Sequence, residues 1–166
     1  MAAPQGRGTY PAVVPAAPGA DSARVIENLV HTYAERIDAG DLDGVAELFT
    51  HGRIHGVEGG GPETVFEGRD AVRRLYAATT RVHEETGTPR THHVTTNLIL
   101  EVDDEAGTAT CRSRFTVLQA TEALALQPII AGRYHDTFHR IDGSWWFESR
   151  TMHVDLVGDL SHHLLI

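Results

Sequence analysis

The stretch that decides the fold is "THHVTTNLILEVDDEAGTATCRSRFTVLQ", from Thr91 to Gln119. Apolar and polar residues alternate in both halves, which is typical of β-strands. The "DDEAGT" between them has the composition of a hairpin turn. Residues 128–143 and 144–156 repeat the pattern around "IDGS". Because strands joined by short turns pair antiparallel, we expect a meander of four long strands.

The preceding part of the chain has a helical period. A helix is expected from Asp21 or Ser22, as N-cap, to Gly40, and a second over residues 41–50 with Asp41 as N-cap. Residues 69–85 indicate a third helix, and residues 52–70 contain two short strands around a glycine-rich loop. The apolar stripe of the first helix comprises Val25, Ile26, Leu29, Val30, Tyr33 and Ile37.

Helices followed by an antiparallel meander predict an α+β fold. One face of the sheet must be covered by the helices. If the sheet is strongly curved, it encloses with the first helix a cone-shaped apolar pocket, which suits a small apolar ligand.

Composition narrows the possible functions. The 166 residues suit one domain, and the 41% hydrophobic and 22% charged residues indicate a folded, soluble chain. A net charge of −9 without a basic run argues against a nucleic-acid partner, and the apolar runs are too short for a membrane span. The single cysteine, Cys111, indicates a buried thiol in a reducing cytoplasm.

The first twenty residues contain four prolines, which interrupt any apolar run that a signal peptide would need. We therefore expect an extended N-terminal arm over residues 1–20 and one domain over residues 21–166. The arm is either a tail or a segment that packs on a neighbouring subunit.

Two positions on the first helix are candidates for chemistry. Asp38 lies four residues after Ala34 and eight after Val30, so it follows the apolar stripe, unless it is simply solvated at the last turn. Tyr33 lies on the same side, either as a core residue or as a hydroxyl that needs a partner.

The adjacent His92 and His93 must point to opposite faces of their strand. Simple alternation places Leu98 and Leu100 on the face of His92, and Asn97 on the face of His93. At most one of the two histidines enters a pocket, and alternation does not say which.

The eleven histidines show no metal-binding spacing such as HExxH, so we expect neither a metal nor a cofactor. His162 and His163 are expected at the surface. No nucleophile motif is present either. Acid–base chemistry by His, Asp and Tyr remains.

The order "IDAGDLDGVAELF", "GRDAV", "THHVTTN" and "GRYHDTFHRIDGSWWF" resembles the SnoaL-like branch of the nuclear transport factor 2-like superfamily, over residues 21–160. The resemblance implies a cystatin-like α+β cone. Two members, scytalone dehydratase and bile-acid 7α-dehydratase, carry an aspartate and a histidine at the places of Asp38 and His93. The second enzyme also has a tyrosine at the place of Tyr33.

There are departures from these two enzymes. Ile37 stands where scytalone dehydratase has a tyrosine, and Val117 or Leu118 where it has a second histidine. Asp155 falls near an arginine of the bile-acid enzyme. The resemblance therefore implies a set of catalytic residues and no particular substrate.

From this resemblance we expect a cofactor-free dehydratase, isomerase or cyclase for a small apolar carbonyl compound. His93 would be the base, Asp38 its orienting carboxylate and Tyr33 the oxyanion donor. The alternative is a non-catalytic binding or assembly subunit, such as the small subunit of a ring-hydroxylating dioxygenase. The expected pocket lining is Tyr134, Phe115, Arg114 and Trp146.

We also expect a homodimer or, second, a homotrimer, because a long curved sheet leaves an apolar outer face to be covered. The residues expected to cover it are Trp145, Trp146, Ile129 and Ile130.

Overall fold

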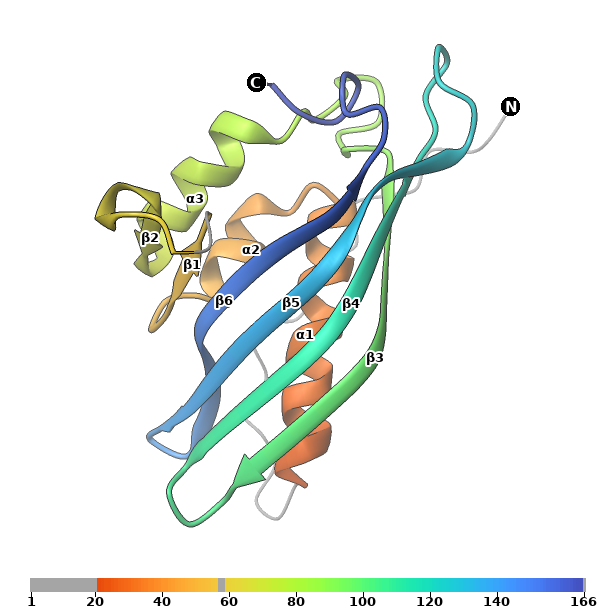
Figure 1. The fold of residues 1–166 in the computed structure, drawn as a ribbon. Helices are drawn as coiled ribbons and strands as arrows, with labels where there is room; N and C mark the ends of the chain where they lie inside the picture. Colours follow the sequence, from red (N-terminus) through yellow and green to blue (C-terminus); the bar gives the residue numbers. More distant parts are fainter. Residues whose placement is uncertain (1–20, 57–58, 166) are drawn as a thin grey trace.

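The computed structural model describes residues 21–56 and 59–165, so the expected arm over residues 1–20 lies outside the described part. Three helices precede a sheet of four long strands (Figure 1). The elements are α1 (Ser22–Asp38), α2 (Leu42–Glu47), β1 (Arg53–His55), the short 3₁₀ helix η1 (Pro62–Thr64), β2 (Val65–Glu67), α3 (Gly68–Thr79), β3 (Thr91–Asp103), β4 (Thr108–Gln119), β5 (Gln127–Ile141) and β6 (Ser144–Val157).

The six strands form one sheet in the order β2-β1-β6-β5-β4-β3. The meander from β3 to β6 is antiparallel throughout, which confirms the strand prediction. β1 runs parallel to β6, however, so the sheet is mixed rather than purely antiparallel. The sheet is curved but not closed, and α1 lies along its inner side (Figure 1). This is the predicted α+β cone.

The first two helices begin where the sequence indicates. The Asp21 carboxylate accepts from the backbone N–H of Ala23, and the Asp41 carboxylate accepts from that of Gly44. Gly40, at φ +73°, follows α1, where a left-handed residue is the usual way to end a helix.

The third helix is shorter than predicted. α3 ends at Thr79, because Thr80 is extended and forms a β-bridge with Leu164. Val82 therefore lies beyond the helix, although within the predicted range of residues 69–85, and is 37% exposed. A local sequence pattern cannot indicate this ending, since the pairing partner is more than eighty residues away.

A β-bulge changes the facing of β3. The register with β4 shifts by one residue between Thr96 and Ile99, where Asn97 adopts φ +54°. Leu98 and Leu100 therefore pack toward the core, on the face of His93, while Ile99 is exposed. The expectation that these leucines share a face with His92 is wrong, because alternation assumes an unbroken ladder.

A second bulge brings a charged residue into the core. The register between β5 and β6 shifts at Glu148, so Phe147 and Arg150 both point inward although they are three residues apart. Nε and Nη2 of Arg150 donate to the two carboxylate oxygens of Asp136 at 2.8 and 2.7 Å. Both side chains are fully buried. The paired geometry offsets the cost of removing the two charges from water.

The outer face of the sheet differs from the expectation. Trp145 and Ile129 are buried in the core and cannot cover that face. The exposed large apolar residues of the meander are Val94, Ile99, Val154, Leu156 and Val157.

Cys111 is buried, and burial raises the pKa of its thiol to about 11, so the thiol stays protonated near neutral pH.

Among the described helices, none combines the length and apolar character needed to cross a bilayer.

The ion pair predicts an asymmetric response to mutation. Arg150→Ala leaves the Asp136 carboxylate buried without its cation, and should lower the free energy of unfolding by about 3–5 kcal/mol in urea titrations. Arg133→Ala removes one of the two arginine partners of exposed Asp155, on the other face of the same strands, and should change stability little. Equal losses in the two variants would contradict this account of the core.

Candidate active site

The carboxylate of Asp38, the last residue of α1, joins the helix to the start of β3. Its Oδ1 accepts from the hydroxyl of Thr91 at 2.7 Å and lies 2.6 Å from Nδ1 of His93. Its Oδ2 accepts from the backbone N–H of His93 at 2.7 Å. One side chain thus fixes both the backbone and the ring of His93.

This geometry sets the electrostatics of the pair. Burial alone would raise the pKa of Asp38, but the hydrogen bond and charge of His93, with the N–H and hydroxyl donors, hold it below its ordinary value. The carboxylate is therefore ionised at neutral pH and accepts a hydrogen bond from Nδ1–H of His93. That fixes the tautomer of His93 in which Nε2 carries the lone pair. Among the described residues, no hydrogen-bond partner occupies Nε2.

Tyr33 lies beside this pair, on the inner face of α1. Its ring meets the His93 ring edge-on, with centroids 6.3 Å apart. Its hydroxyl lies 2.7 Å from that of Tyr76 on α3, and both side chains are buried. Burial raises the pKa of both phenols, although Arg150 acts in the opposite direction. Both therefore remain protonated and can donate hydrogen bonds.

The buried ion pair lies directly behind the tyrosines. The Arg150 guanidinium carbon is 4.2 Å from the ring centroid of Tyr33 and 4.0 Å from that of Tyr134. Burial alone would lower the pKa of Arg150, but Asp136 raises it above its ordinary value, so the cation persists without solvent. A permanent positive charge close to buried phenols favours any negative charge that develops beside them.

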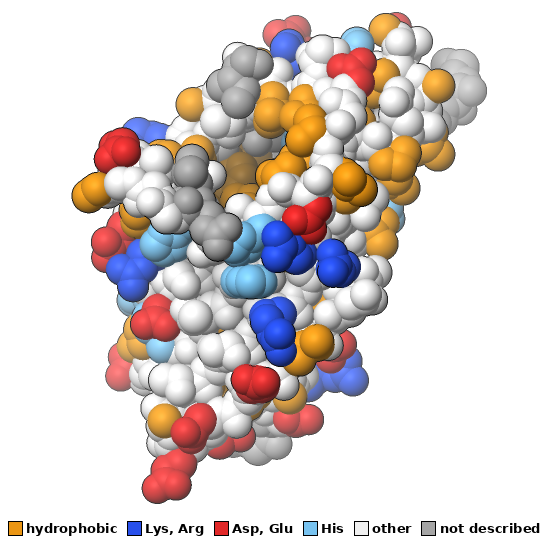
Figure 2. Space-filling model, in the orientation of Figure 1, with side chains coloured by type: hydrophobic (Ala, Val, Ile, Leu, Met, Phe, Trp, Pro, Cys, Tyr) orange, Lys and Arg blue, Asp and Glu red, His pale blue; other side chains and the backbone are white. Residues whose placement is uncertain are grey.

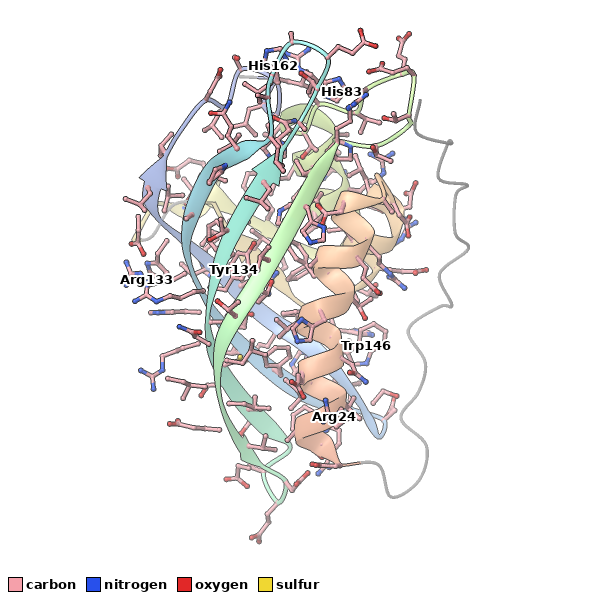
Figure 3. The ribbon with its side chains drawn as sticks, turned by 90° about the vertical axis from the view of Figure 1, so that its right-hand side faces the viewer. Arg24, His83, Arg133, Tyr134, Trp146 and His162 are labelled. Atoms are coloured by element: carbon pink, nitrogen blue, oxygen red, sulfur yellow. The ribbon has the colours of Figure 1, made fainter. Side chains whose placement is uncertain are left out.

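Two of the four expected lining residues lie on the inner face of the sheet, where Tyr134 stacks on Phe115 with centroids 4.4 Å apart. Figure 3 shows Tyr134 on the strands of the sheet, beside α1 in this view. The other two expected residues, Arg114 and Trp146, do not lie on the inner face. Arg114 is exposed on the opposite face, 3.6 Å from Asp155. Trp146 lies on the opposite side of β6 from Phe147 and packs against the ring of His51. The expectation for Arg114 and Trp146 is thus wrong, because the pleat turns them away.

Two charged residues of the site, Asp136 and Arg150, were not predicted from the sequence. Asp136 carried a usable signal, since it stands between Tyr134 and Phe138 on one face of a strand. Arg150 carried none, because the bulge at Glu148 reverses its facing.

The space-filling view shows where the interior opens. A hollow with hydrophobic walls lies between α3 and the end of β6 (Figures 1 and 2). Within the described ranges, no group of three or more His, Cys, Asp or Glu residues is arranged to hold a metal ion.

Comparisons with known proteins agree with this fold. A family profile described as a SnoaL-like domain matches residues 20–151. No curated protein sequence matches the chain significantly.

A protein of unknown function from Mycobacterium tuberculosis is 29% identical, with a TM-score of 0.61, over 80% of this chain and 70% of that chain. A nuclear transport factor 2-like protein with a cystatin-like fold, from Novosphingobium aromaticivorans, is 22% identical, with a TM-score of 0.63, over 82% and 83%. A proposed scytalone dehydratase from the same organism is 23% identical, with a TM-score of 0.62, over 82% and 86%. The last two likenesses establish the fold alone.

The depressed pKa of Asp38 predicts a pH-dependent contribution to stability. The contribution is fully present above the unfolded-state pKa of about 4, and is lost as pH falls through the lower folded-state value. The difference in free energy of unfolding between wild type and Asp38→Asn should therefore be largest near neutral pH and shrink below about pH 4. Urea titrations at pH 7, 5 and about 3 measure it. A difference independent of pH would contradict the charged hydrogen bonds.

Proposed function

The chain belongs to the SnoaL-like domain family, and on that premise we propose that it is a cofactor-free acid–base enzyme acting on a small apolar carbonyl compound. The reaction is abstraction of a proton next to the carbonyl, followed by dehydration, isomerisation or ring closure. The observation that carries the proposal is the 2.6 Å contact between Nδ1 of His93 and Asp38.

His93 is the general base in this scheme. Its Nδ1–H is held by Asp38, so Nε2 accepts the proton from the α-carbon of the substrate. The imidazolium formed is stabilised by the carboxylate 2.6 Å away. The ring needs no reorientation, because Asp38 also holds the backbone N–H of His93.

Tyr33 supports the developing oxyanion. If Tyr76 donates to the Tyr33 oxygen across their 2.7 Å contact, the Tyr33 proton is free for the substrate oxygen. The Arg150 cation behind the ring favours charge at that place. For a β-hydroxy ketone, the enolate then reforms its carbonyl and expels the β-hydroxyl, which takes the proton from Nε2 and leaves as water.

This proposal predicts large kinetic effects at the pair. The probe is the aldol of benzaldehyde and acetone, an aromatic β-hydroxy ketone, within a panel of related aldols. Enone formation is followed by absorbance, and α-deuterium incorporation by NMR in deuterated water. His93→Ala removes the base and should lower kcat by about a hundredfold or more. Asp38→Asn should do the same, because an amide that donates to Nδ1 forces the wrong tautomer.

The chain supplies matched controls. His92→Ala removes the adjacent imidazole, which points to the other face of β3, and should leave kcat unchanged. Thr91→Val removes one hydrogen bond to Asp38 but keeps the contact with His93, and should cost only a few-fold in kcat. A wild type that neither eliminates nor exchanges any member of the panel would refute the proposal, as would equal rates in the His93 and His92 variants.

A further inference from the structure

The C-terminal segment, residues 158–165, folds back over the end of the sheet where β3 begins. The backbone N–H of Arg81 donates to the carbonyl of His163 at 2.8 Å, and that of Leu165 donates to the carbonyl of Thr79 at 3.0 Å. The segment thus pairs with the chain that leaves α3. Figure 3 shows His162 and His83 together at this end of the molecule.

The same segment is tied to the strands that carry the site. The carbonyl of His162 accepts from Nε2 of buried Gln119 and lies 3.1 Å from Nε2 of His83. Gln119 is the register partner of Thr91, which donates to Asp38. The C-terminal segment is therefore linked to Asp38 through Gln119 and Thr91.

His163 corrects the expectation of a surface residue. Its side chain is half-buried, and it lies close enough to His93, Asp38 and His83 for their charges to act on it. Its Nδ1 is buried and has no hydrogen-bond partner among the described residues. Oε1 of Gln119, in the same region, is also buried and has no hydrogen-bond partner among the described residues.

A buried polar atom without a partner is costly, because it has lost its hydrogen bonds to water without replacing them. Native proteins keep few such atoms, and those at a functional site commonly meet a ligand. The hollow seen in Figure 2 lies beside this segment, so a molecule in the hollow is the natural partner.

Burial lowers the pKa of His163 to about 4, and the neighbouring His93 acts in the same direction. The ring is therefore neutral near pH 7. A neutral imidazole either donates or accepts at Nδ1, according to its tautomer.

We propose that His163 is a substrate-binding residue, whose Nδ1 hydrogen-bonds an oxygen of the ligand from which His93 abstracts a proton. The inference rests on the proposed function for the identity of the ligand as an oxygenated apolar compound. It adds a second polar contact to the site. The C-terminal segment then closes the pocket and selects compounds with a second oxygen, such as β-hydroxy ketones, over simple ketones.

The test separates an effect on binding from an effect on folding, because His163→Leu should weaken ligand binding without lowering stability. His163→Leu keeps volume but removes the unpartnered polar atom, so the urea midpoint should stay equal or rise. Binding of the aldol probe, titrated by NMR on His93→Ala protein to prevent turnover, should weaken roughly tenfold. His163→Gln keeps a polar end and should recover part of the affinity. His162→Leu is the matched control and should bind the probe normally, because the contacts with Gln119 and His83 use the carbonyl of His162 and its ring approaches only the Thr121 hydroxyl, at 3.5 Å.

Selectivity supplies the second readout. Benzylacetone lacks the β-hydroxyl, so His163→Leu should weaken its binding less than that of the aldol. Equal binding of the aldol by the His163→Leu and parent proteins would overturn the inference, and so would a fall in stability that accounts for the lost binding. Because these titrations need no turnover, failure of the proposed chemistry appears separately, in the rates of the His93 and His92 variants.

Discussion

The carboxylate of Asp38 holds together the two parts of the fold that form the site. It sits at the end of α1 and takes three hydrogen bonds from the first residues of β3. Those bonds determine where the first long strand begins relative to the helix. Since each later strand of the meander pairs with the one before it, the whole sheet is placed against α1 from this corner. The residue that orients the imidazole is thus also a structural residue.

The second constraint is the charge in the core. A buried arginine and aspartate cost free energy that a pair of apolar residues would not, even when their hydrogen bonds are ideal. Here the pair lies against Tyr33 and Tyr134, with no water to screen it. Such an arrangement contributes little to stability by itself, but it supplies a fixed electric field at one place. We interpret the buried ion pair as a feature that serves the electrostatics of the site rather than the stability of the core.

The family gives the fold but not the reaction. Members of one fold carry different chemistry, because function depends on the side chains that converge in the site. In this chain the C-terminal segment brings His163 close enough to His93 for their charges to interact. The unpartnered atoms at that end make its contribution a question of ligand binding rather than of packing.

The sequence by itself determined the elements and part of the site. Periodicity located α1, α2 and the four strands, because burial of one face repeats every 3.6 or 2 residues. The family resemblance picked out Tyr33, Asp38 and His93, which lie together in the structure, while their catalytic roles remain predictions. Tertiary structure alone decided which side chains face inward after Asn97 and Glu148, since a bulge reverses alternation without a reliable local signal. It alone ended α3 at Thr79 and brought His163 to the site, because those contacts join residues far apart in the chain.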